Sequence, residues 1–397
     1  MHSHPIAVAL AVPLVLWASA AQAEPQTGWA NGANAQPASL LTSGPLTWSL
    51  LVDTYYGFDF NRPADHTVYP TTTAPRHNEF NLNHAFLGAE VTGVENVLGK
   101  LVLQTGNYVD TLYGADPTLN RGAYSGILNL HNVQQAYAGY KFPWGTWVTG
   151  IFPAYVGLES YINQENWNYT HSLLSDFTPY YLVGTSLQRD LRDDLAGQVW
   201  LVNGWQSVSK FGEGMGVGWQ LTYHPTDRLS LVHNFLGGNF DRDQGRTRFY
   251  ADNSVQWQYA RPAWAKRLSL AAVADLGYET AGTLPATVMG GLALYHRAEL
   301  DDHWALGLRG SAFGDPQQLL ALTVPAGQAL PDGGTLMPWE VTATLDYKPS
   351  AWLLYRLEYR HDGSNIPFIA GPGGITGSAP NFLTSGDRVT ANVSMRL

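Results

Sequence analysis

The amino-acid sequence predicts an all-β protein, a single antiparallel transmembrane β-barrel of about 16 strands, with 14 or 18 strands as alternatives. Three observations predict this class. Many segments alternate between apolar and polar residues with a period of two, which is the pattern of a strand with two different faces. The connections between these segments are alternately short and long, as in barrels with short periplasmic turns and long external loops. Charged residues make up only 14% of the 397 residues and aromatic residues 12%, which is typical of a wall that faces lipid.

The segment 338–348 shows the alternation clearly. Its odd-numbered positions from Trp339 to Tyr347 are apolar or aromatic, and its even-numbered positions from Glu340 to Asp346 are polar. Since successive side chains of a strand point to opposite faces, one face of this strand suits lipid and the other suits water. Segments of this kind lie near residues 46–57, 79–91, 99–107, 132–142, 145–154, 181–190, 194–203, 214–224, 228–237, 249–259, 267–279, 286–298, 303–313, 338–348, 351–361 and 387–397. The phase of the alternation is ambiguous in 79–91, 132–142 and 249–259, which leaves the alternative strand counts open.

The lengths of the connections indicate which end of the barrel is periplasmic and which is external. Short connections lie at 142–145, 190–194, 224–228, 300–303 and 348–350, and long ones at 58–78, 108–131, 155–180, 238–248, 314–337 and 362–386. We expect the short ones to be periplasmic turns and the long ones to be external loops. Both termini of the barrel then fall on the periplasmic side, which requires an even number of strands.

The N-terminal region has the layout of a secretory signal peptide. An apolar run from Ile6 to Trp17 is followed by small residues that end in Ala21-Gln22-Ala23, an A-x-A cleavage site. The run is too short to cross a bilayer as a helix, which needs about 20 residues. We therefore expect a signal peptide at 1–23, an N-terminal periplasmic segment at 24–45 and one barrel domain at 46–397.

Composition argues against several classes of function. The chain has no cysteine, which excludes thiolate catalysis and zinc sites with cysteine ligands. Its formal net charge of −10, without a basic stripe, argues against a nucleic-acid partner. The 12 histidines form no metal-binding motif, so we expect no metal and no cofactor. We also expect no enzymatic activity, although His171-Ser172 lies in a long external segment, where a Ser/His pair of an outer-membrane hydrolase would have to lie.

Charged residues on the polar faces of the strands are the candidates for lining a pore. In lipid, each such charge would cost about 2–4 kcal/mol near the bilayer midplane, so these side chains must face the lumen. The candidates are Arg309, Asp346, Arg356, Glu358, Arg360 and Asp275. Two interpretations stay open: a charged wall that filters solutes, or ion pairs that only satisfy one another. A soluble β-sandwich would also alternate, but it would leave this charged face as its whole exterior.

A run of glycines in the segment 214–224 needs its own interpretation. Gly214, Gly216 and Gly218 share the polar parity of this strand. The run superficially resembles a nucleotide-binding loop, but such a loop must open a helix, whereas the strand pattern here continues to Tyr223. We expect the glycines to keep the lumen wall thin or to allow strong curvature.

Short motifs along most of the chain resemble those of a known family. The most specific is Val52-Asp53-Thr54-Tyr55-Tyr56-Gly57-Phe58-Asp59-Phe60-Asn61-Arg62-Pro63, at the first strand and loop. Others are Phe80-Asn81-Leu82-Asn83, Gln134-Gln135-Ala136-Tyr137, Asn166-Trp167-Asn168-Tyr169-Thr170-His171-Ser172, Leu201-Val202-Asn203-Gly204-Trp205 and Glu358-Tyr359-Arg360-His361-Asp362. On these motifs the chain resembles the β-barrel porin-2, or OmpL-like, family. The resemblance implies an outer-membrane barrel that acts as a porin, and it implies no catalytic residues.

The segment 155–180 is the third external connection in the chain. In general porins of similar size, the third external loop folds into the pore and narrows it. Here that arrangement would place the carboxylates of Glu159, Glu165 and Asp176 at a constriction, opposite the arginines.

These observations together favour a porin of the bacterial outer membrane through which small hydrophilic solutes or ions diffuse passively. A barrel of about 16 strands is wide enough to hold a water-filled channel. The expected partners are outer-membrane lipid, lipopolysaccharide and the solutes, and the chain could form a homotrimer. Two alternatives stay open: a non-conducting structural or adhesion barrel that binds a partner through its external loops, and an outer-membrane hydrolase.

Overall fold

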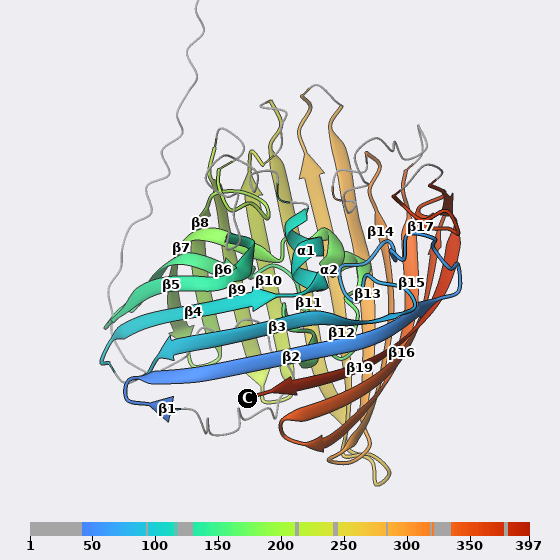
Figure 1. Cartoon of the computed structure of the whole chain (residues 1–397). Helices are drawn as coiled ribbons and strands as arrows, with labels where there is room; N and C mark the ends of the chain where they lie inside the picture. Colours follow the sequence, from blue (N-terminus) through green and yellow to red (C-terminus); the bar gives the residue numbers. More distant parts are fainter. Residues whose placement is uncertain are drawn as a thin grey trace, which may run out of the picture.

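A closed antiparallel barrel makes up most of the chain (Figure 1). The computed structural model describes residues 42–92, 94–114, 116, 130–210, 214–240, 245–282, 285–317, 320, 335–376 and 380–397. The strands of the wall are β2 (Leu46–Asp59), β3 (Glu79–Val91), β4 (Val97–Thr105), β5 (Val133–Phe142), β6 (Gly145–Pro153), β7 (Tyr181–Arg192), β8 (Leu195–Val202), β9 (Gly216–Thr226), β10 (Leu229–Gly238), β11 (Arg248–Ala260), β12 (Arg267–Glu279), β13 (Thr287–Glu299), β14 (Trp304–Gly314), β15 (Pro338–Ser350), β16 (Leu353–Ser364) and β19 (Ser385–Arg396). The barrel closes where β19 pairs with β2, from Arg388 opposite Asp59 to Arg396 opposite Leu51. The prediction of 16 antiparallel strands is therefore confirmed.

Smaller elements lie between and beside the wall strands. A two-residue strand, β1 (Thr42–Ser43), pairs with the beginning of β2. The helices are α1 (Asn107–Gly114) and α2 (Leu173–Phe177), with 3-10 turns η1 (Leu130–Asn132) and η2 (Asn163–Glu165). A short hairpin, β17 (Ile369–Ala370) and β18 (Phe382–Leu383), lies in the connection between β16 and β19. No helix among the described residues has both the length and the apolar character needed to cross a membrane.

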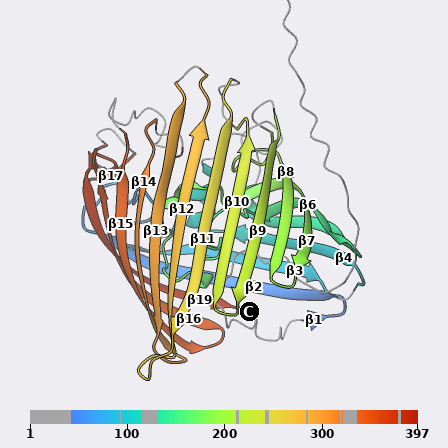
Figure 2. The ribbon, with the colours of Figure 1, turned by 180° about the vertical axis from the view of Figure 1, so that it is seen from behind.

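The two faces of the wall differ as the alternation predicts. On β15, Trp339 and Val341 are exposed to 42% and 55%, whereas Glu340 and Thr342 between them are exposed to 1% and 0%. The same alternation continues along the neighbouring strands, whose outward positions are mostly Leu, Val, Trp and Tyr. Figure 2 shows these strands running side by side from one end of the barrel to the other. The apolar outer face is what lipid requires of a membrane barrel.

Each of the three strands with an ambiguous phase contains a β-bulge. On β3, Asp53 is paired with His84 and Thr54 with Leu82, so Asn83 is the additional residue. The register also shifts at the beginning of β5, where Gln134 is passed over, and near the end of β11, where Tyr259 is passed over. Because a bulge inserts one residue, it exchanges the inward and outward parities along the strand.

The connections follow the predicted alternation, with two additions. Turns of a few residues join β5 to β6, β7 to β8, β9 to β10 and β15 to β16 at one end of the barrel. At the other end, the strands are joined by longer connections, which are residues 60–78, 106–132, 154–180, 203–215, 239–247, 280–286, 315–337 and 365–384. The segments 203–215 and 280–286 were not among the long connections that we expected. The expected signal peptide at 1–23, and 24–41 of the expected periplasmic segment, lie outside the described residues.

Candidate functional site

The connection between β6 and β7, residues 154–180, runs through the inside of the barrel, and we call it the lumen loop. Near its beginning, the Tyr155 hydroxyl donates a 2.6 Å hydrogen bond to the backbone oxygen of Phe235 in β10. Further along, the Tyr169 hydroxyl donates a 3.0 Å hydrogen bond to Asp53 Oδ1 in β2. Because β2 and β10 are half the barrel apart in the strand order, the loop crosses the lumen from one wall to the opposite wall.

Glycine at position 218 makes room for the first of these contacts. A Cβ atom on Gly218, in the inward face of β9, would overlap the hydroxyl of Tyr155. The Gln220 side chain, two residues along the same face, donates a 2.9 Å hydrogen bond to the backbone oxygen of Tyr155. The glycine therefore thins the wall where an aromatic side chain of the lumen loop rests against it, as the sequence predicts.

One guanidinium holds the turn at the tip of the lumen loop. Arg356 in β16 donates to the backbone oxygens of Asn163 at 2.7 Å and Asn166 at 2.6 Å. Its Nε lies 3.1 Å from Asp346 Oδ1 in β15. An arginine presents several N–H donors in a fixed plane, so one side chain can satisfy several carbonyl groups of a turn that has no regular partner.

A carboxylate holds the next part of the loop. Glu358, also in β16, accepts hydrogen bonds from the backbone N–H groups of Tyr169 at 2.6 Å and Thr170 at 3.0 Å. It also accepts from the hydroxyls of Thr170 and Thr344, both at 2.6 Å. Glu358 is exposed to only 1%. Four donors around one buried carboxylate make it a charge-assisted anchor for the loop.

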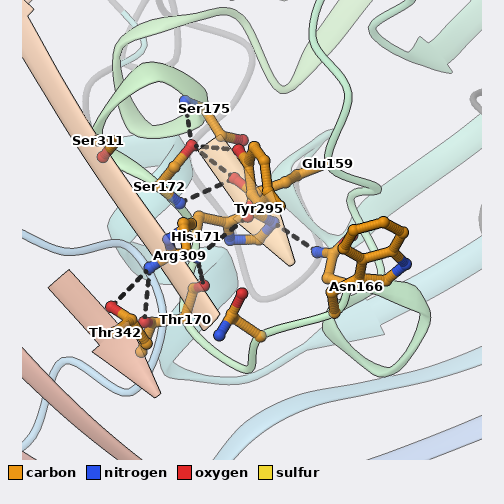
Figure 3. Close-up of polar contacts among 12 residues, drawn as sticks. Glu159, Asn166, Thr170, His171, Ser172, Ser175, Tyr295, Arg309, Ser311 and Thr342 are labelled. Carbon is orange, nitrogen blue, oxygen red and sulfur yellow. Dashed lines mark hydrogen bonds and ion pairs between the residues drawn. The ribbon is translucent and has the colours of Figure 1, made fainter. Parts of the chain in front are cut away.

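Two further arginines complete the attachment. Arg309 in β14 binds Glu340 of β15 at 2.8 Å. It also binds Glu159 of the loop at 3.0 Å and donates to the backbone oxygen of Thr170 (Figure 3). Arg360 in β16 donates a 2.6 Å hydrogen bond to the backbone oxygen of His171. We refer to Arg309, Arg356, Glu358 and Arg360 as the loop anchor.

The structure thus places the predicted pore-lining residues inside the barrel but beneath the lumen loop. The exposed fractions are 2% for Arg309, 2% for Asp346, 4% for Arg356, 1% for Glu358, 0% for Arg360 and 6% for Asp275. Their inward direction is as we expected. A charged wall in contact with solvent is not what the geometry shows, because the loop covers these groups and uses their hydrogen bonds. Of the two interpretations left open, the arrangement agrees with the second, in which these groups form ion pairs and hydrogen bonds with one another and with the loop.

Asp275 has no contact with the loop anchor among the contacts described and lies on a different strand, β12. It lies directly opposite Asp252 of β11 and accepts a 2.8 Å hydrogen bond from the hydroxyl of Tyr250. Asp252 accepts in turn from the backbone N–H of Gly157, at the beginning of the lumen loop, over 3.3 Å. The structure therefore connects Asp275 to the opposite part of the loop and does not bring it together with the arginines.

The three predicted constriction carboxylates all lie on the lumen loop, in different surroundings. Glu159 faces Arg309, and Glu165 pairs with Arg396 of β19. Asp176, in α2, accepts hydrogen bonds from the hydroxyls of Thr72 at 2.6 Å and Tyr180 at 2.7 Å. Two of the three carboxylates therefore oppose arginines of the wall, whereas Asp176 holds the neighbouring external loop, 60–78. Their role in narrowing a passage stays a prediction.

Two cavities lie between the lumen loop and the periplasmic turns, and we call them together the vestibule. The first, about 360 Å³, is lined by charged residues that include Lys100, Arg297 and Arg396. The second, about 260 Å³, is lined by Trp167 of the lumen loop, by inward residues of β10–β13 and by residues at the turn between β9 and β10, among them Asp227 and Arg228. Arg267 and Glu299 line both. Sequence analysis did not single out this region, although the inward parity of Gln256, Gln258 and Ser269 could have indicated a polar wall.

The neighbours His171 and Ser172 do not form a catalytic pair. The Ser172 hydroxyl donates to Glu159 Oε2 at 2.7 Å, accepts from the backbone N–H of Ser175 at the beginning of α2, and lies 3.1 Å from the Tyr295 hydroxyl (Figure 3). His171 instead contacts the hydroxyl of Thr73. Within the described ranges, no group of three or more His, Cys, Asp or Glu side chains could hold a metal ion.

Comparison of the sequence with protein families gives a match to the family described as "Putative beta-barrel porin-2, OmpL-like" over residues 45–391. The chain belongs to this family. Membership of this porin family, together with the closed barrel, identifies the protein as an outer-membrane barrel. No curated protein matches the sequence.

Solved structures similar to this OmpL-like barrel include several outer-membrane channels. The anion-selective porin from Comamonas acidovorans has a TM-score of 0.55 at 10% identity, with 89% of this chain and 99% of that chain covered. The channel DcaP of Acinetobacter baumannii has a TM-score of 0.55 at 11% identity, with 89% and 97% covered. The trimer form of OmpT, an outer membrane protein of Vibrio cholerae, has a TM-score of 0.54 at 10% identity, with 90% and 100% covered. At such low identity, the similarity shows a shared fold.

Proposed function

We propose that this protein is a channel through which small hydrophilic solutes cross the outer membrane by passive diffusion. The observation that carries the proposal is the lumen loop, which crosses the barrel and is fixed to its wall by the loop anchor. A loop that only filled space would not need four buried charged side chains to hold it in one position. We infer that the anchor sets the width of the passage beside the loop, and that the vestibule is its periplasmic entrance.

An apolar cluster within the barrel favours a second candidate, a barrel that does not conduct. Tyr155 and Phe177 of the lumen loop pack with inward residues of the wall, among them Trp200, Tyr250 and Phe313. Phe368, from the connection between β16 and β19, belongs to the same cluster. Such packing resembles a protein core more than a wet pore. A barrel closed in this way would act through its external surface.

Conductance of the refolded protein in a planar lipid bilayer separates the two candidates. We expect the full chain to give stepwise openings, and a variant without residues 160–175 to give larger ones, because this deletion removes the constriction. Equal conductance of the two proteins would contradict the proposed role of the loop. A silent full chain beside a conducting deletion variant would instead support the second candidate. Folding of each protein is checked first by its heat-modifiable migration in an SDS gel.

We also propose that the apolar outer face contacts outer-membrane lipid and lipopolysaccharide, and that three copies associate into a homotrimer. The support for the trimer is the trimer form of the similar Vibrio cholerae protein. Migration of the unheated protein in an SDS gel, combined with its mass in detergent, tests this assembly. A single monomeric species at all protein concentrations would contradict it.

A further inference from the structure

The second cavity of the vestibule combines an aromatic face with a polar wall. Trp167 lies at the tip of the lumen loop, and its indole packs edge-to-face against Tyr295 with 6.4 Å between ring centroids. Its backbone oxygen accepts a 3.1 Å hydrogen bond from Arg297, which fixes the residue against β13. The same indole lines the cavity of about 260 Å³. The loop therefore presents a fixed aromatic ring to the space beneath it.

Amide and hydroxyl side chains form one part of the wall of this cavity. Gln256 and Gln258 project from β11, and Ser230 and Ser269 project from the strands on either side. Amides and hydroxyls both donate and accept hydrogen bonds, and they carry no charge. A ligand that matches this wall must offer several hydroxyl groups and needs no charge of its own.

The vestibule carries charges of both signs, and several of them are paired. Arg267 pairs with Glu299 inside the same cavity. Arg261 donates a 3.0 Å hydrogen bond to the neutral amide of Gln258, and Asp227 and Arg228 of the turn between β9 and β10 also line this cavity. In the adjoining cavity, Lys100 lies 3.0 Å from Glu90, and Arg297 lies 2.8 Å from Asp346. Charges of both signs around one cavity partly cancel, so the lining does not select strongly for an anion or a cation. Their planar guanidinium and carboxylate groups can still hydrogen-bond to neighbouring hydroxyls of one ligand.

We propose that the Trp167 cavity is a binding site for neutral sugars. The ring carbons of a sugar carry C–H groups that pack on an aromatic face, while its hydroxyls match the amides, the serines and the Arg267–Glu299 pair. This inference rests on the proposed channel function, because a sugar that diffuses through the barrel would pass the cavity. Binding itself does not require conduction.

The test measures sugar binding and ion current separately on the refolded full chain. Titration calorimetry in detergent uses glucose and maltose as neutral probes and glycine as a zwitterionic probe. We expect saturable binding of a sugar and none of glycine, and we expect Trp167→Ala to weaken sugar binding about tenfold. Trp264→Ala is the matched control, because Trp264 is 65% exposed in the turn between β11 and β12, outside the lining of the cavity, and it should bind as the unaltered chain does.

A second variant guards against misfolding of the first. Gln256→Leu combined with Gln258→Leu keeps the size of both side chains but removes their hydrogen bonds, and it should also weaken sugar binding. Absence of saturable sugar binding to the unaltered chain would overturn the inference, and so would folded Trp167 and Gln variants that bind normally. A barrel that conducts but binds no sugar would leave the proposed channel intact and refute the sugar site. A barrel that binds sugar but never conducts would refute the channel and support the site.

Discussion

The guanidinium of Arg356 donates a 2.7 Å hydrogen bond to the backbone oxygen of Asn163, 193 residues earlier in the chain. The bond joins the wall of the barrel to the tip of the lumen loop. Both groups are buried, so neither can exchange its partner for bulk water without moving the loop.

Replacing this arginine should release the loop tip. Arg356→Met removes the donors to Asn163 and Asn166 and leaves the carboxylate of Asp346 with one cation fewer. We expect a loss of about 3–5 kcal/mol in stability, because one partner of a buried ion pair is removed. Thermal unfolding measures the loss, and the bilayer current should become larger and noisier. Arg192→Met is the control, since Arg192 forms an exposed pair with Asp194. Equal unfolding temperatures for the two variants would contradict the role of the anchor.

The pair between Glu159 and Arg309 should show energetic coupling. Both side chains are almost fully buried, and they lie 3.0 Å apart. In a double-mutant cycle of Glu159→Gln and Arg309→Met, we expect a coupling energy of about 1–3 kcal/mol. The arginine variant should be the more damaging single change, because Arg309 also holds Glu340 and the backbone of Thr170. Additive losses would show that the loop does not depend on this pair.

A side chain at position 218 should push the lumen loop away from β9. Gly218→Ala places a methyl group where the hydroxyl of Tyr155 lies, so the hydrogen bond from Tyr155 to Phe235 must break. We expect lower stability and an altered conductance. Gly310→Ala in β14 is the matched control, because its added Cβ would meet only the Glu340 backbone oxygen, at 3.7 Å. Similar effects of the two substitutions would argue against the close approach of Tyr155.

The external loops should separate in acid. Burial acts to raise the pKa of Asp65, but hydrogen bonds from Thr376, Thr67 and Ile375 outweigh it and hold this pKa below its ordinary value. For a carboxyl group with a lowered pKa, the stabilisation is present above the unfolded pKa of about 3.9 and is lost as the pH falls through the lower, folded value. Limited proteolysis of the loops 60–78 and 365–384 should therefore accelerate below about pH 4.

Asp65→Asn tests the same contact at neutral pH. The substitution removes the charge that the N–H groups of Ile375 and Thr376 bind, so cleavage of the two loops should already be fast at pH 7 and should depend little on pH. Asp301→Asn is the control, because backbone hydrogen bonds from His303 and Trp304 also lower the pKa of Asp301, but at a periplasmic turn. A retained acid response in Asp65→Asn would assign the response to other groups.

The fold could be predicted from the sequence because strand alternation is a local property. Each segment such as 338–348 shows by itself which residues face lipid. A bulge at Asn83 or Gln134 changes the inward and outward parity of its own strand only. The inward direction of Arg356 and Glu358 followed from the same parity. The sequence also suggested that the loop 155–180 lies opposite the arginines. The contacts by which these charged residues hold the loop did not follow, because their partners are backbone groups about 190 residues away, and the sequence does not show which backbone groups a side chain will bind.

The position of the anchor in the chain has a consequence for assembly. The lumen loop is synthesised well before Arg309, Arg356, Glu358 and Arg360, which follow the groups they bind by about 140 to 190 residues. Until these last strands join, the loop can make only its contacts with earlier strands, such as those of Tyr155 with β10 and Tyr169 with β2. In a half-inserted barrel, the tip of the loop would therefore lack its anchor, and the C-terminal strands both close the barrel against β2 and supply the side chains that hold the loop. Contacts so distant in sequence are slow to form, so we expect the loop to take its final position only when insertion is complete.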